Sequence, residues 1–480
     1  MNTSDTTTAP RRPARAWPLE NALVSAALAA QRVSWIDAPA RAIGLKPLTR
    51  QHLTRQVLAQ LRRTSSGRPT RLRTAFGTFL MPLNADDATS LIGRADEAGA
   101  RGDVTTLTAE GRRLRLTPHA ALPVPLGTLR TQVRAAAEEE AAAIYAMRRR
   151  DGSLGRADWC TLTARLARRI VLGDGAADDS LVSAILEATA QAEDSTEYDA
   201  RTAALRRRLA PYVHAEAPGG LVTSDLADDA RDAVVEHALE TVSRALTDTA
   251  PQALALVTVQ PLMPATDRTE RAVSEALRRY PPLAATVHTV CAPFVWHSLA
   301  VEAGTEILCA TAWLRDLDEE QGRSGGDPSA SLCAAPAPCS AAGLAVLAAT
   351  ELVRALTRIA EPVVLAPHLT LDALPADLPA ASLRLAMEDT DHAPRDAAEP
   401  VIDGYVPPIV GQSPAHYAAL AAADARSLEE HARKLVACAR QSGWNHDAFG
   451  ERCRMTLLAH AERCARAAGD ARRAAEWLAN

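Results

Sequence analysis

The chain has 480 residues, 47% of them hydrophobic and 23% charged, which is ordinary for a soluble globular protein. The formal net charge of −5 excludes a chain that as a whole would match nucleic acid or an anionic membrane. Aromatic residues make up only 4%, and alanine supplies much of the apolar content, so the composition favours a helix-rich fold.

The eight cysteines form no C-x-x-C pair and no spacing typical of a secreted disulfide scaffold. Near the N-terminus an apolar run follows basic residues, but Glu20 and Asn21 interrupt it and it is too short to span a bilayer. We therefore expect a first amphipathic helix there, and a cytoplasmic protein whose cysteines stay reduced.

The predicted elements begin after a leader, 1–18, whose Thr, Pro and Arg content predicts disorder. Two short strand-like runs and a helix start lie within 71–92, and the Ala/Leu/Arg-rich stretch 127–247 has the period of packed helices. Residues 283–311 switch to β-branched residues with turn signals, which predicts a small sheet. A loop rich in Gly, Pro and Ser then leads into a buried helix at 340–358.

Another strand-like pair is predicted over 363–390. A Pro-rich, acidic break at 393–413 follows, which we interpret as a linker. Beyond it, Ala/Arg/Glu-rich stretches predict a helical extension at 414–480. The predicted organisation is one mostly-α body with a small β-sheet at 19–392, followed by the linker and the extension.

The stretch SEALRRYPP places Glu275 and Arg278 on one helical face, where opposite charges pair. Pro281 and Pro282 end the helix, and VEAGTEIL and LRDL follow downstream. This order resembles the cytochrome P450 family of haem-thiolate enzymes, in which the E-x-x-R pair is a buried structural ion pair behind the haem. An exposed surface pair is the alternative interpretation of the two residues alone.

The stretch LCAAPAPCSAAGLAVLAATEL places Cys339 at the mouth of the buried helix. A thiolate there gains from the helix dipole and from free backbone N–H groups. The stretch resembles the cysteine loop of the same family, with Leu332 at the position of its Phe. The resemblance implies that Cys339 is the thiolate ligand of a haem b iron. Packing of a small buried residue is the alternative.

Two further stretches resemble the segments of the family that hold the haem propionates. TAEGRRLRL places Arg112 and Arg115 where the family has E-H-R-x-x-R, with Gly111 in place of its His. His288 follows the proline pair at the distance where the family has another propionate-binding residue. Arg provides the fork that a carboxylate accepts. Each of these residues alone is equally compatible with a surface charge.

The oxygen-activating helix is placed at EHALETVSRAL by the same resemblance. One register puts Glu240 and Thr241 at the acid–alcohol pair that relays protons to bound dioxygen, and puts His237 over the haem. An imidazole there would ligate the iron or occupy the oxygen site. A register shifted by one puts Val242 at the threonine, and an ordinary amphipathic helix is a third interpretation.

The cysteine loop also departs from the family. Ala337 replaces a propionate-binding residue, Ala341 replaces the Gly after the ligand, and the aromatic/Arg segment before the loop is missing. These losses bear on haem retention rather than on chain packing, and they leave two functions open.

The first is a divergent haem-dependent monooxygenase that oxidises a small organic substrate, in specialised metabolism, with electrons from a ferredoxin and reductase or with peroxide. The second is a protein of the same fold that has lost its haem or its oxygen chemistry and binds a partner enzyme. A helical protein unrelated to the family, matched through its Ala/Arg-rich composition, is the third class.

The extension carries Cys453, His460 and Cys464 on one helical face. With Cys438 or His446 from the neighbouring helix they have the chemistry of a soft-metal site. We interpret them as small residues in a helix–helix seam, and we keep the metal site as the alternative.

Overall fold

The computed structural model divides the chain into two compact units, Met1–Ala393 and Pro394–Asn480. The residues that it describes are 13–31, 50–107, 113–148, 152–192, 194–214, 220–221, 228–259, 265–322, 327–335, 339–367, 369, 374–375, 378–389 and scattered helical positions between 422 and 476.

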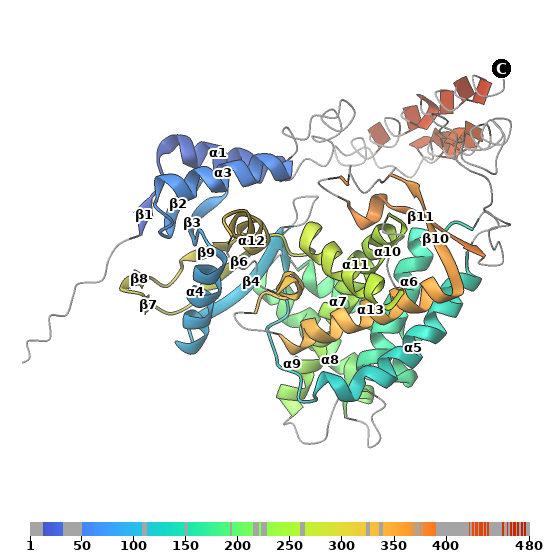
Figure 1. The fold of residues 1–480 in the computed structure, drawn as a ribbon, viewed down its shortest axis with the longest axis horizontal. Helices are drawn as coiled ribbons and strands as arrows, with labels where there is room; N and C mark the ends of the chain where they lie inside the picture. Colours follow the sequence, from blue (N-terminus) through green and yellow to red (C-terminus); the bar gives the residue numbers. More distant parts are fainter. Residues whose placement is uncertain are drawn as a thin grey trace, which may run out of the picture. The chain divides into compact units, whose positions relative to one another are not determined.

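A seven-stranded mixed sheet forms one part of the first unit (Figure 1). Its neighbouring strands pair antiparallel except at β1/β2 and β3/β9, which are parallel. In spatial order the strands are β1 (Ala14–Arg15), β2 (Thr70–Thr74), β3 (Gly77–Met81), β9 (Glu306–Cys309), β6 (Thr286–Val290), β4 (Arg101–Leu107) and β5 (Arg113–Arg115).

Four helices accompany the sheet: α1 (Pro18–Gln31), α3 (Arg50–Thr64), α4 (Ala85–Glu97) and α12 (Thr311–Glu320). Helix α4 begins where Asn84 caps it, because the Asn84 side chain accepts a hydrogen bond from the Asp87 N–H at 2.6 Å. Two short hairpins complete the strands: β7 (Phe294–Trp296) with β8 (Leu299–Val301), and β10 (Ala360–Ala366) with β11 (Arg384–Asp389).

The helical body holds the largest hydrophobic core. Its helices are α5 (Leu126–Ala146), α6 (Arg156–Leu172), α7 (Ser180–Ala190), α8 (Ser195–Val213), α9 (Asp228–Arg244), α10 (Ala250–Thr258), α11 (Ala265–Arg279) and α13 (Ser340–Ile359). A π-helical turn, Ala245–Thr249, joins α9 to α10. The prediction of a mostly helical protein with a small sheet is confirmed.

Helix α13 lies at the centre of this body and packs along α5 and α9 (Figure 1). Its alanines let neighbouring helices approach closely, and Ala341, Ala345 and Ala348 are fully buried. Among the described residues it is the one helix long and apolar enough to cross a membrane, and 67% of that apolar window is buried inside the protein. We therefore assign it to the core.

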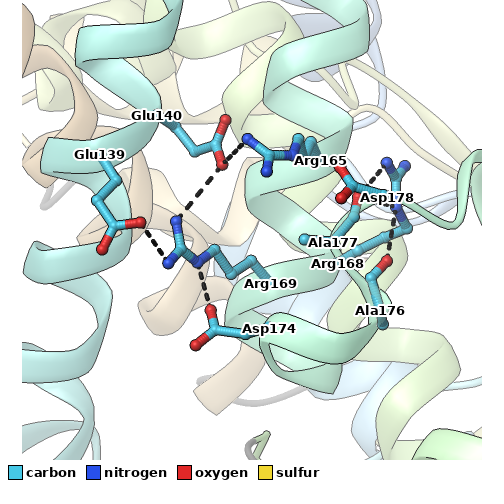
Figure 2. A network of polar contacts seen from close by, with 9 residues as sticks. All are labelled: Glu139, Glu140, Arg165, Arg168, Arg169, Asp174, Ala176, Ala177 and Asp178. Atoms are coloured by element: carbon cyan, nitrogen blue, oxygen red, sulfur yellow. Dashed lines mark hydrogen bonds and ion pairs between the residues drawn. The ribbon is translucent and has the colours of Figure 1, made fainter.

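A charged network fixes α5 against α6 (Figure 2). Arg165 contacts the fully buried Glu140 at 2.8 Å and also Asp178. Arg168 donates to the carbonyls of Ala176 and Ala177, so it holds the turn after α6. Burial raises the pKa of Glu140, and Arg165 opposes this rise. The network orients the two helices that support α9 and α13.

The part of the predicted leader that the structure describes contains a strand, because β1 pairs with β2 at Ala14 and Arg15. Residues 1–12 lie outside the described part. In the second unit the described positions are helical. The boundaries of the linker and the extension stay predictions.

Candidate functional site

Four side chains that can bind a metal converge between α9 and the start of α13: His119, His237, Cys333 and Cys339. One donor atom from each lies within 4.8 Å of all the others. His119 stands in the loop after β5, His237 on α9, Cys333 after the short helix η4 (Pro328–Ser331), and Cys339 at the start of α13. The metal ligand expected at Cys339 is thus part of a group that can hold a metal ion.

The distances within this four-residue cluster are short. His237 Nε2 lies 3.3 Å from Cys339 Sγ, 3.4 Å from Cys333 Sγ and 3.4 Å from His119 Nδ1. Cys333 Sγ lies 3.9 Å from His119 Nδ1. The two imidazole rings meet edge to face, with their planes at 86°. All four donor atoms therefore surround one small volume.

Cys339 caps α13. Its Sγ accepts a hydrogen bond from the Ala342 N–H at 3.4 Å, so the sulfur occupies the position where free helix N–H groups point. The next residue, Ser340, accepts a hydrogen bond from the Leu122 N–H at 2.7 Å. This bond ties the loop that carries His119 to the start of α13.

Arg244, at the end of α9, holds the loop that carries Cys333. Its Nη1 donates to the Leu332 carbonyl at 2.7 Å, and its Nη2 pairs with Glu240. The Leu283 N–H donates to the Ser331 carbonyl at 3.0 Å. Both neighbours of Cys333 on its N-terminal side are thus fixed by hydrogen bonds.

The pKa values of the two thiols shift in opposite directions. A hydrogen bond from Cys333 lowers the pKa of Cys339 against the burial that raises it. The hydrogen bond to Cys339 and burial raise the pKa of Cys333. The lowered pKa of Cys339 favours its thiolate, which is the form that binds metals.

Thr117 fixes the orientation and the tautomer of His237. Its hydroxyl donates to Glu240 Oε2 and lies 3.4 Å from His237 Nδ1. Because the hydroxyl proton is given to the carboxylate, the hydroxyl accepts from Nδ1–H. Nε2, the other ring nitrogen, then faces the two sulfurs and His119.

The predicted acid–alcohol pair lies next to the cluster on α9. Glu240 accepts the Thr117 N–H at 2.8 Å, in addition to its contacts with the Thr117 hydroxyl and Arg244. Thr241 is fully buried and donates to the carbonyl of His237 at 2.8 Å. Glu240 thus has three partners and Thr241 bonds back to its own helix. Their proposed proton relay stays a prediction.

Arg115 and His288, both predicted to bind propionates, have different interaction partners. Arg112 is outside the described residues. Arg115 pairs with Asp103 at 3.1 Å and lies over the ring of Tyr198. His288 is buried in β6, where its Nε2 meets the Thr286 hydroxyl at 2.9 Å. Burial, with a smaller effect of Arg101, lowers the pKa of His288 to about 3.

Glu275 and Arg278 pair on α11 as the sequence predicts, with Nε–Oε2 and Nη2–Oε1 distances of 2.9 and 2.7 Å. Arg279 also contacts Glu275, and Glu319 lies 3.6 Å from Arg278. The pair is only partly buried, since 37% of the Arg278 side chain is exposed.

The cysteine and histidine stripe of the extension falls largely outside the described residues, at positions 438, 446, 453 and 460. Cys464 is described and is partly buried. The seam and the metal site therefore both stay hypotheses for that segment.

His119 and Cys333 were not among the predicted site residues, because nothing local in the sequence joins them to Cys339. Two signals could have found them. Cys333 precedes Cys339 by six residues in the same Ala/Pro-rich loop, and His119 lies in a loop between prolines directly after the Arg-rich segment. His237 was recognised as a potential ligand from its position on α9.

A haem requires Cys339 Sγ to face one side of a flat ring. His237 Nε2 lies 3.3 Å from that sulfur, whereas a ring lying between the two atoms at van der Waals distance needs roughly 7 Å. As ligands on opposite faces of one metal, a sulfur and a nitrogen would stand about 4.3 Å apart. Cys333 and His119 converge on the same point, where the ring itself would lie. The donor set does not fit a haem.

No protein-family model and no curated protein sequence matches the chain. Solved structures that it is similar to are cytochromes P450, the family that its motifs resemble. CYP175A1 from Thermus thermophilus has a TM-score of 0.42 at 18% identity, covering 71% of this chain and 96% of that one. P450BioI, solved in complex with an acyl carrier protein, has a TM-score of 0.45 at 13% identity, covering 70% and 98% of the two chains. OxyC, implicated in an oxidative C–C coupling reaction during vancomycin biosynthesis, has a TM-score of 0.43 at 14% identity, covering 64% and 87%.

Proposed function

We propose that this chain is a protein with a cytochrome P450-like body that has given up haem and oxygen chemistry, and that it acts as an accessory protein on a partner enzyme. The observation that carries the proposal is the 3.3 Å contact between His237 Nε2 and Cys339 Sγ. Oxygen activation needs a metal with one open coordination face, and here the face above the sulfur is filled by an imidazole.

The side chains around the cluster support the same proposal. A proton relay needs a carboxylate and a hydroxyl free to face the reacting oxygen. Glu240 instead accepts from Thr117 and Arg244, and the Thr241 hydroxyl donates within α9. These contacts make both residues part of the packing around His237.

Arg115 and His288, the two described residues expected to hold propionates, offer little to an anionic group. Arg115 already neutralises Asp103. His288, with a pKa lowered to about 3 by burial, is uncharged in the neutral range and has no positive charge to offer a carboxylate. A protein that has lost its reacting cofactor still has a folded surface. We propose that this surface binds the partner enzyme.

Absorption spectroscopy tests the proposal. The full chain is produced with a haem precursor in the medium, purified, titrated with haemin, and measured again after reduction under carbon monoxide. We expect a colourless protein and no Soret band beyond that of free haemin. Cys309→Ala serves as the matched control for thiol loss, because Cys309 is a buried cysteine on β9, outside the cluster.

A strongly red-shifted Soret band that disappears in Cys339→Ala and persists in Cys309→Ala would overturn the proposal. The function would then be the other one that the sequence predicts, oxidation of a small organic substrate in specialised metabolism with a redox partner or peroxide.

A further inference from the structure

We infer that His119, His237, Cys333 and Cys339 bind one Zn²⁺ ion in a closed tetrahedral site that joins four separate segments of the body. The inference deepens the proposed function and rests on it, because an ion held by all four residues leaves no place for a haem. Distances, donor chemistry and second-layer hydrogen bonds each support it.

The distances match those of a four-coordinate zinc. With Zn–N bonds of about 2.05 Å and Zn–S bonds of about 2.3 Å at tetrahedral angles, ligand atoms stand about 3.3 Å apart for N–N and about 3.6 Å for N–S. The N–N distance here is 3.4 Å. Three of the four N–S distances are 3.3, 3.4 and 3.9 Å. Small movements of the side chains bring all four donors into bonding range.

The donor set selects the metal. Two cysteine sulfurs and two imidazoles in a tetrahedral arrangement suit zinc, with the Cys333 proton released to solvent as the ion binds, whereas Mg²⁺ and Ca²⁺ take oxygen ligands in larger coordination shells. Four protein ligands leave no open position for water or substrate. The site is therefore structural, since catalytic zinc keeps one position free.

The surroundings of His237 are those of a metal ligand. Such a histidine donates its second ring nitrogen to a fixed acceptor, and here Nδ1 meets the Thr117 hydroxyl, which is itself bound to Glu240. Arg244 then links Glu240 to the Cys333 loop through the Leu332 carbonyl. One chain of contacts thus orients a ligand from α9 and a ligand from the loop.

The cluster places four metal-binding atoms around one buried point. Nε2 of His237 faces two sulfurs and a second imidazole nitrogen, and His237 and Cys333 are both buried. A cation between these atoms would contact all of them at once. His119 is partly exposed, so the ion has an entry side at its loop.

The first experiment is metal analysis of the full chain, purified without chelator and without an affinity tag that binds metals. We expect one zinc per chain. Cys333→Ala, Cys339→Ala and His237→Ala should each reduce zinc retained after dialysis by at least about tenfold. Cys309→Ala should keep the full amount.

The second experiment uses the unmodified chain, so that it stands even if the ligand variants fail to fold. Zinc is removed and replaced by Co²⁺. Visible d–d bands of a tetrahedral cobalt site, together with thiolate-to-cobalt charge transfer, support the inference. A spectrum of six-coordinate cobalt without charge transfer overturns it.

A third measurement addresses a disulfide between Cys333 and Cys339. The unreduced protein is unfolded in the presence of a chelator and alkylated, so that zinc shields no thiol, and mass analysis counts the free thiols. Eight alkylated cysteines are expected from the eight in the chain, and loss of this one pair to a disulfide overturns the inference. If the chain takes up neither haem nor zinc, the zinc site is wrong and the proposed function is unaffected. If the chain binds haem through Cys339, both the zinc site and the proposed function are wrong.

Discussion

Thr117 is the residue that orients His237 in the cluster. Its hydroxyl stands between Glu240 and His237, so it links the carboxylate to the ring that faces the two sulfurs. Its backbone N–H bonds to Glu240 independently of the side chain. Replacing the hydroxyl alone therefore removes the orienting bond while the loop keeps its anchor.

We predict that Thr117→Val lowers zinc affinity by about 10- to 100-fold, the usual cost of losing a hydrogen bond to a metal-ligating histidine. Competition against a colorimetric chelator measures the affinity. Thr163→Val is the matched control, because Thr163 is a buried threonine whose hydroxyl donates only within α6, to Trp159 and Cys160. Equal affinities of the two variants would contradict the assigned role.

His288 makes the stability of the sheet depend on pH. Burial lowers its pKa to about 3 from an ordinary 6.5, and Nδ1 has no hydrogen-bond partner among the described residues. Between these two values the unfolded chain takes up a proton that the folded chain does not. The free energy of unfolding therefore falls as pH drops from about 6.5 towards about 3, by an amount on the order of a few kcal/mol.

His288→Leu should flatten this acid dependence. Urea unfolding at pH 7, 5.5 and 4.5 gives the slope of the free energy of unfolding against pH. A loss of stability that is the same at every pH does not change this slope. His52→Leu, at an exposed position on α3, should leave the slope as it is. If the slope of His288→Leu equals that of the parent chain, the histidine is not the titrating group.

At the scale of elements, the contact between the end of α6 and the segment before α9 leaves no room for a side chain. A Cβ on Gly220 would lie 2.5 Å from the Val171 carbonyl oxygen and 2.8 Å from the Leu172 carbonyl carbon. Both neighbours are backbone atoms, so the segment itself would have to move. The adjacent Leu221 N–H donates to the same Val171 carbonyl at 3.1 Å.

Gly220→Ala should lower the free energy of unfolding by about 1–3 kcal/mol, the range for overpacking. Gly127→Ala in the first turn of α5 has open space around the new methyl group and should raise stability by up to about 1 kcal/mol. Chemical denaturation of both variants checks the pair. Similar values for the two would show that the predicted steric conflict relaxes freely.

The sequence predicts these elements well where their signals are local. A helix start is predicted within 71–92, where α4 begins, and the alanine-rich stretch after Cys339 predicts α13. It predicts the site only in part, because a pattern around one residue cannot report a neighbour distant in the chain. Cys339 and His237 stand out through their own surroundings, whereas His119 and Cys333 become site residues only when the loops fold onto α9 and α13.

At the scale of the whole molecule, the first unit has a large core of its own. Among the described residues, its four hydrophobic clusters contain positions from Val24 to Met387. All four proposed zinc ligands belong to the same unit.

A chain ending at residue 393 should therefore keep its cooperative thermal unfolding and its single zinc, with a Tm near that of the full chain. Calorimetry and metal analysis test this. A chain ending at residue 378 lacks β11 with the buried Leu385 and Met387 and should fail to fold. Loss of cooperative unfolding in the 393-residue chain would make the second unit part of one folding unit with the first.

The sequence separation of the four ligands has a consequence for the order of folding. His119 and His237 are 118 residues apart, and 96 more separate His237 from Cys333. In small zinc modules the ligands are neighbours in the chain, so the ion can organise the first turn of structure. Here two long loops must close before the donors meet, and packing of the helices offsets the entropy lost on closing them. Zinc would thus bind in the last step of folding. A molecule that contains zinc would therefore be one whose helical body is already folded.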